Sequence, residues 1–182
     1  MLDRRQLFGG LTLAGAALVG LTPVFAQPLP ALAWAPQALT PVQARTLDVA
    51  AELIIPATDT PGARAAGVPQ FVDRAVATYC TPADVTVIKA VLDRMESDAQ
   101  AKHGAAFAAI TPAQQAALLT GYDAARAAPD RPLGYSVLKE LVTVGFFTSE
   151  PGATKALRYD PVPGDYRGCV PLKEIGRAWA TS

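Results

Sequence analysis

The chain has 182 residues, of which 51% are hydrophobic and 18% charged, and its 16 basic and 16 acidic residues give a formal net charge of zero. No cluster of Lys and Arg stands out, which argues against a nucleic-acid-binding surface, because phosphates require such clusters. Sixteen prolines, many alanines and few β-branched runs favour helices over a sheet. We therefore expect an all-α fold, a compact bundle of about five to six short helices with proline-rich loops and an irregular C-terminal segment.

The first 26 residues are organised like an export signal. Arg4 and Arg5 precede an apolar run of about fifteen residues, and Ala26 closes the segment with a small side chain suited to cleavage. This run is short for a membrane span, which needs roughly 20 apolar residues. The paired arginines indicate the twin-arginine route, which carries folded cargo. An uncleaved membrane anchor and a signal for unfolded export are the alternatives.

The predicted organisation has three parts: a signal over 1–26, an extended lead-in over 27–39 and a single helical domain over 40–182. The signal holds one acidic and two basic residues, so the remaining 156 residues have 15 acidic and 14 basic residues and a net charge of −1. A chain of that length is the size of one domain. Trp34 is expected to attach the lead-in to that domain.

Three helices are predicted to begin at Thr-Pro pairs, which start at Thr40, Thr81 and Thr111. In each pair the threonine side chain caps the helix, and the proline suits the first turn. A glutamine three residues after the first threonine completes a capping box. The first helix is expected to end before Pro56 and the second at Gly104.

Two further helices and an irregular segment complete the prediction. One helix runs from about Pro69 to Tyr79, with Phe71, Val72 and Ala75 turned inward. The other, from about Gly134 to Phe147, has so little polar surface that we expect it to be the central helix. A short helix near Pro151–Ala156 precedes residues 158–166, where prolines and a glycine disfavour both helix and central strand.

The sequence assigns no catalytic, cofactor-binding or metal-binding residue. The single histidine, His103, lies at a predicted helix end, and its neighbours provide no partner for a metal or acid–base site. No haem-attachment motif or glycine-rich nucleotide-binding motif occurs. Asp48 and Glu52 lie one helical turn apart, a spacing for which a solvated face is favoured over paired catalytic carboxylates.

Two loops are predicted to be held by a partner protein. In the first, hydroxyl and carboxylate side chains can bond nearby backbone N–H groups, and a Pro-Gly pair sets a turn. The second, from Tyr159 to Pro171, is rich in aromatic side chains with polar tips. The predicted interface residues are Thr58, Asp59, Thr60, Pro61, Tyr159, Asp160 and Tyr166.

The two cysteines, Cys80 and Cys169, form a candidate disulfide, because an exported protein enters an oxidising compartment. Closing so long a loop would add about 2 to 5 kcal/mol to the stability of the domain. Two free thiols are the alternative.

Three stretches resemble the gluconate 2-dehydrogenase subunit 3 family. They are residues 54–73, which contain Pro-Ala-Thr-Asp-Thr-Pro-Gly, residues 145–153, and residues 158–164. The resemblance extends from about Thr40 to Trp179. Members of this family look like small subunits of membrane-associated dehydrogenases that oxidise gluconate and related sugars or polyols. The resemblance implies FAD in a large subunit and haem c in a multihaem cytochrome subunit, with no cofactor in this chain.

The resemblance also implies what this chain does. A noncatalytic small subunit would fold with the flavoprotein large subunit and take it through the twin-arginine translocase. The expected location is the periplasm, at the inner membrane through the complex, and the expected reaction of the complex is oxidation of a CH–OH group. A free-standing periplasmic binding or stress protein is the alternative, and an enzyme acting by itself is a third interpretation.

Overall fold

The computed structural model describes residues 31–125, 133–159, 164 and 169–180. Five residues of the predicted signal and interface lie outside this part of the chain: Arg4, Arg5, Ala26, Asp160 and Tyr166.

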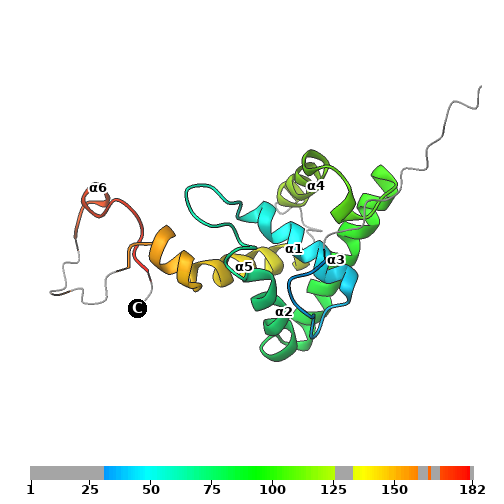
Figure 1. Cartoon of the computed structure of the whole chain (residues 1–182), viewed down its shortest axis with the longest axis horizontal. Coiled ribbons are helices and arrows are strands. Elements are labelled where there is room, and N and C mark those ends of the chain that lie inside the picture. Colours follow the sequence, from blue (N-terminus) through cyan, green and yellow to red (C-terminus); the bar gives the residue numbers. More distant parts are fainter. Residues whose placement is uncertain (1–30, 126–132, 160–163, 165–168, 181–182) are drawn as a thin grey trace, which may run out of the picture.

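The described residues form six α-helices, which confirms the predicted all-α fold (Figure 1). They are α1 (Pro41–Ile54), α2 (Val68–Thr78), α3 (Pro82–His103), α4 (Pro112–Ala125), α5 (Leu133–Phe147) and α6 (Leu172–Ile175). Two shorter elements join them, the 3₁₀ turn η1 (Phe107–Ala109) and the π-helical turn η2 (Gly152–Ala156). No strand occurs among these residues, and extended pairing is limited to one isolated bridge between Arg158 and Trp179.

The Thr-Pro pairs start helices as predicted. At the start of α1 the Thr40 hydroxyl accepts from the Gln43 N–H at 3.2 Å, and the Gln43 side chain accepts from the Thr40 N–H at 3.1 Å. This reciprocal pair is a capping box, which satisfies two N–H groups that would otherwise lack partners. Thr81 and Thr111 accept in the same way from the residue three positions on. The local sequence therefore sets where these helices begin.

Helix α5 is the central helix, as its apolar composition predicts. It packs on α1, α2 and α3, and three of its side chains, Tyr135, Leu138 and Val142, are fully buried. Gly134 allows the close approach to α3, because a Cβ at this position would collide with the Val87 carbonyl. Beyond the bundle, α5 continues toward η2 and α6, which lie at one end of the molecule in Figure 1.

The described part of the predicted lead-in is attached to the domain. Its described part, residues 31–39, contains no helix, and Trp34 is half-buried against the core. The attachment that the sequence did not indicate is Asp73 of α2, a buried side chain whose carboxylate accepts three backbone N–H groups from residues 37–39. A long-range polar contact therefore fixes the approach to α1.

One inward-facing side chain was predicted wrongly. Phe71 is 37% exposed and lies on the surface, where its ring covers Gly145 of α5. Val72 and Ala75, which were predicted to face inward with it, are buried. The prediction is therefore confirmed at Val72 and Ala75 and wrong at Phe71, whose ring packs over Gly145 and stays partly in solvent.

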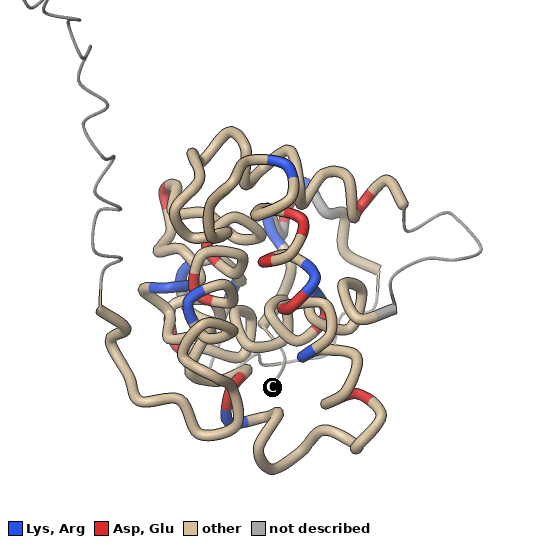
Figure 2. Tube along the Cα trace, turned by 90° about the vertical axis from the view of Figure 1, so that its right-hand side faces the viewer, with Lys and Arg blue, Asp and Glu red and all other residues tan. Residues whose placement is uncertain are grey.

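The described helices have neither a surface of one charge sign nor a membrane-spanning segment. Figure 2 shows Lys and Arg interspersed with Asp and Glu over these helices, without a face of one sign. Within the same part of the chain, no helix has the length and apolar character needed to cross a membrane.

Candidate partner interface

His103 lies where the sequence placed it, at the exposed C-terminal end of α3. Nothing in its surroundings builds a metal site: in the described part of the chain, no group of three or more His, Cys, Asp or Glu side chains could hold an ion. Helix α3 ends at Gly104, whose backbone is left-handed with φ 69° and whose N–H donates to the Gln100 carbonyl. The end of the helix is therefore explained by Gly104.

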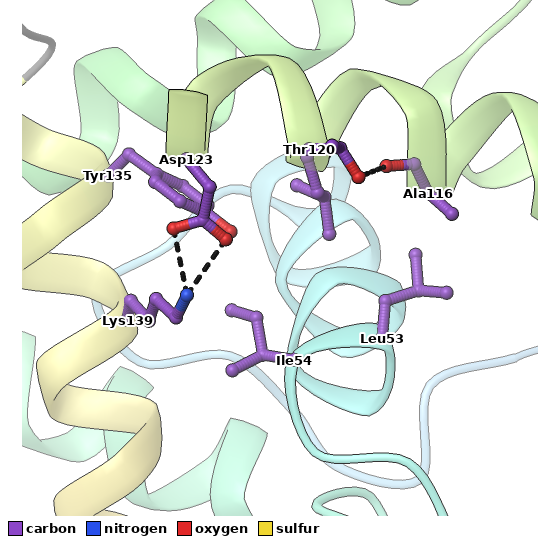
Figure 3. Close-up of a pocket in the computed structure, with 8 residues that line it drawn as sticks. Leu53, Ile54, Ala116, Thr120, Asp123, Tyr135 and Lys139 are labelled. Carbon is purple, nitrogen blue, oxygen red and sulfur yellow. Dashed lines mark hydrogen bonds and ion pairs between the residues drawn. The ribbon is translucent and has the colours of Figure 1, made fainter. Parts of the chain in front are cut away.

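A small cavity of about 170 Å³ lies between α1, α4 and α5 (Figure 3). Lys139 Nζ donates to both carboxylate oxygens of Asp123 at 2.8 Å, and Leu53 and Ile54 provide the apolar wall. Burial, and then the Asp123 carboxylate, raise the pKa of Tyr135 to about 12. The tyrosine therefore keeps its proton at neutral pH, and the lysine is occupied by an ion pair. This arrangement joins α4 to α5.

Asp48 and Glu52 support the loop that was predicted to face a partner. Glu52 accepts from the backbone N–H groups of Ala57 at 3.3 Å and of Arg64 at 2.9 Å. Asp48 accepts from Arg64 Nε at 2.9 Å. Burial raises the pKa of Asp48, and the adjacent Arg64 opposes that shift. Both carboxylates are half-buried and hold the loop that follows their own helix, a structural role that the expectation of a solvated face did not include.

Gly62 is needed for that support, because a Cβ there would collide with the Glu52 carboxylate. The Ala63 N–H donates to the Ile55 carbonyl at 2.9 Å and closes the loop. At its tip, Thr58 and Asp59 are exposed and bonded to each other, with 2.9 Å between the Thr58 hydroxyl and Asp59 Oδ1. The loop over 55–63 is thus a constrained projection, which Figure 1 shows between α1 and α2.

Three more exposed apolar side chains lie on α2 and on the last turn of α5. Phe71, Val144 and Phe147, which we call the apolar ridge, are 37%, 45% and 38% exposed. Phe71 covers Gly145, so α2 contributes its ring directly beside the outer face of α5. The Phe147 ring is held edge-on by the buried Phe146, with 5.3 Å between ring centroids. A partly buried aromatic held in this way loses little freedom when a partner covers it.

The C-terminal arm, which comprises the described residues 152–159 and 169–180, exposes two more aromatic side chains. Tyr159 is 57% and Trp179 is 44% exposed. Arg158 holds the arm closed, since its backbone pairs with Ala178 and Ala180 at 2.8 Å and its guanidinium lies 4.3 Å from the centre of the Trp179 ring. Exposed aromatic and arginine side chains are the types most often found at the energetic centres of protein interfaces.

The structure therefore brings together only part of the predicted interface. Tyr159 follows Arg158, which pairs with Trp179 in the arm, whereas the tip of the 55–63 loop is a separate polar projection. The sequence analysis missed the ridge because Phe71 was assigned to the core. Phe147 lies in the 145–153 stretch that carries the family resemblance, and this was the available signal.

The two cysteines are not bonded in the structure. Cys80 is half-buried after the end of α2, and Cys169 is exposed in the C-terminal arm. Figure 1 shows α2 in the bundle and the arm beyond the end of α5. A disulfide needs its two Cα atoms within about 7 Å, and this arrangement separates the elements that carry the thiols. Within this fold the predicted bridge is not formed.

The family model described as Gluconate 2-dehydrogenase subunit 3 matches residues 41–164. This range begins with α1 and runs through the bundle, the 55–63 loop and the apolar ridge into the C-terminal arm. Among curated proteins and solved structures, the comparison found no match to the chain.

Proposed function

The chain belongs to the gluconate 2-dehydrogenase subunit 3 family, and from this membership we propose that it is the noncatalytic small subunit of a periplasmic, FAD-dependent sugar or polyol dehydrogenase. In this proposal it folds with a flavoprotein large subunit and takes that subunit through the twin-arginine translocase. The complex remains at the inner membrane, where a multihaem cytochrome c accepts its electrons. The family match over residues 41–164 is the observation that carries the proposal.

The exposed surfaces support a role in assembly. Phe71, Val144, Phe147, Tyr159 and Trp179 are large apolar or aromatic side chains left in solvent by the described bundle and arm. Aromatic side chains are among the types enriched at the energetic centres of protein interfaces. Glu52 and Asp48 hold the 55–63 loop in one conformation, which reduces the entropy that a partner must remove on binding.

Export is tested by replacing Arg4 and Arg5 with lysines in cells that also express the large subunit. The expected result is that both proteins stay in the cytoplasm and that periplasmic dehydrogenase activity is lost, because the twin-arginine route reads the arginine pair. A periplasmic protein exported unfolded serves as the control and should be unaffected. Normal periplasmic dehydrogenase activity in the lysine variant would refute co-export.

Assembly is tested separately by co-purification of the large subunit with variants of the two predicted loops. Asp59→Ala and Tyr159→Ala should each reduce the amount recovered, since an anchor side chain contributes on the order of 2 kcal/mol. The alternative function is a free-standing periplasmic binding protein. In that case the unchanged chain and both variants should be monomers, and none should retain the large subunit. Unchanged recovery for both variants would place the interface elsewhere on the chain.

A further inference from the structure

The residues that join the N-terminal segment to the helical domain are held by a buried carboxylate. Asp73 of α2 is 1% exposed. Its Oδ2 accepts from the Gln37 N–H at 2.7 Å, and its Oδ1 accepts from the Ala38 and Leu39 N–H groups at 3.1 and 3.0 Å. Both oxygens are therefore used by backbone donors from one short stretch, and hydrogen bonds to an ionised acceptor are the stronger kind.

The next backbone N–H group, that of Thr40, connects the lead-in to α1 and, through Gln43, to α3. The Thr40 N–H donates to Gln43 Oε1 at 3.1 Å, and Gln43 Nε2 donates to Asp93 Oδ1 of α3 at 2.8 Å. Four consecutive N–H groups, from residue 37 to residue 40, thus have acceptors on α1 and α2, and α3 fixes one of those acceptors. The Asp73 contacts span 34 to 36 residues of sequence, so they form only when α1 and α2 have packed together.

The same stretch places apolar side chains on the domain. Leu39 is buried, and Leu32, Trp34 and Ala38 pack partly buried against the core. In a chain whose helices had not packed, these side chains would be in water a few residues after the apolar run of the predicted signal. Attachment of the lead-in therefore buries, fully or in part, the apolar side chains that follow the predicted signal.

Resting on the proposed twin-arginine export, we propose that Asp73 is a fold-dependent anchor for the signal-bearing segment. When α1, α2 and α3 are packed, the anchor holds residues 37–39 and the segment leaves the domain from one defined point. When they are not packed, the lead-in is released with its apolar side chains. The anchor thereby couples presentation of the signal to the folded state of the cargo-binding domain.

The test uses the full chain and the variant Asp73→Asn. An asparagine presents an NH₂ group toward at least one backbone donor, so it cannot replace the carboxylate. Hydrogen exchange followed by mass spectrometry should show exchange about tenfold faster or more in residues 31–39, with protection of α3 and α5 retained. Gln37→Pro is the second variant, because it removes one donor and changes no atom of the helices.

Asp98→Asn is the matched control. It also removes a helical carboxylate with a tertiary partner, the Tyr122 hydroxyl at 2.6 Å, but the described polar partners of Asp98 are Tyr122 and Arg94 and lie outside the lead-in. Exchange in residues 31–39 should not change in this variant. Unchanged exchange in both Asp73→Asn and Gln37→Pro would overturn the anchor itself.

Export of the same variants tests the coupling. The periplasmic fraction of Asp73→Asn and Gln37→Pro should fall several-fold relative to Asp98→Asn, measured in cells that express the large subunit. A released lead-in with unchanged export would overturn the coupling. The lysine replacement of Arg4 and Arg5 separates the two ideas: normal export of that variant refutes the proposed route, while the exchange experiment still decides whether Asp73 anchors the lead-in.

Discussion

The helical bundle and the C-terminal arm are held together in different ways. In the bundle, α5 is buried against α1, α2 and α3, with Leu138 and Val142 removed completely from solvent. The arm depends on the backbone pairing and cation–π contact of Arg158, and it leaves Tyr159 and Trp179 exposed. The bundle therefore owes its stability to its own core, whereas the aromatic side chains of the arm and the ridge remain available to another chain.

The largest expected effect is in the bundle. Leu138→Ala removes a fully buried side chain of α5 and should lower the free energy of unfolding by about 2 to 5 kcal/mol, measured by urea denaturation. Val144→Ala on the same helix is the control, because its side chain is 45% exposed, and it should change stability by no more than about 0.5 kcal/mol. Equal losses for the two variants would contradict the assignment of core and surface on α5.

The next effect concerns binding. Phe147→Ala and Trp179→Ala should each weaken binding of the large subunit by about 2 kcal/mol, or about thirtyfold in the dissociation constant, with little change in thermal stability. Tyr79→Ala is the matched control, because Tyr79 is also an exposed aromatic but lies at the end of α2, outside the ridge and the arm. Binding can be measured by surface plasmon resonance. If only Tyr79→Ala lost affinity, the interface would include the end of α2 and not the arm or the apolar ridge.

A smaller effect is expected in the 55–63 loop. Glu52 of α1 holds this loop against the bundle, while its tip is exposed to solvent. Glu52→Gln keeps the shape of the side chain but leaves one of the two N–H groups, of Ala57 or Arg64, facing an amide donor. We expect a loss of about 1 to 2 kcal/mol in stability and faster hydrogen exchange at residues 57–64. Glu140→Gln, an exposed change on α5, should have neither effect.

The smallest effect compares the two thiols. Burial, and then Asp84, raise the pKa of Cys80, while Cys169 is exposed in the arm. Because the thiolate is the reactive form, Cys80 should be alkylated more slowly than Cys169 by iodoacetamide at pH 8. Mass spectrometry of the unreduced protein should find both thiols modified. A product with neither thiol modified would restore the disulfide that the structure lacks.

Much of the fold could be predicted because its signals are local. The starts of α1, α3 and α4 depend on a threonine and on the residue three positions later, so the contacts that define them lie within one turn. The central place of α5 followed from its composition. The exposure of Phe71 could not be predicted in this way. A helical face read from sequence cannot show that the Phe71 ring packs over Gly145 of another helix.

The candidate interface was predicted less completely. The sequence indicated Tyr159 and the 55–63 loop through their aromatic and turn-forming residues. It did not indicate that Asp48 and Glu52 hold that loop, because like charges one turn apart give the same pattern on a solvated helix face. The partner of Arg158 is Trp179, more than twenty residues further along the chain, and no local rule connects them.

By itself, the sequence determined the helical class, the helix starts, the arginine pair at the N-terminus and the resemblance that the family match confirms. Only the tertiary structure decided the contacts between distant residues: Asp73 with residues 37–39, Glu52 with Arg64, and Phe71 with Gly145. The physical reason is range. Capping and turn preferences act over about four residues, whereas a buried carboxylate takes whichever donors the packed helices bring to it.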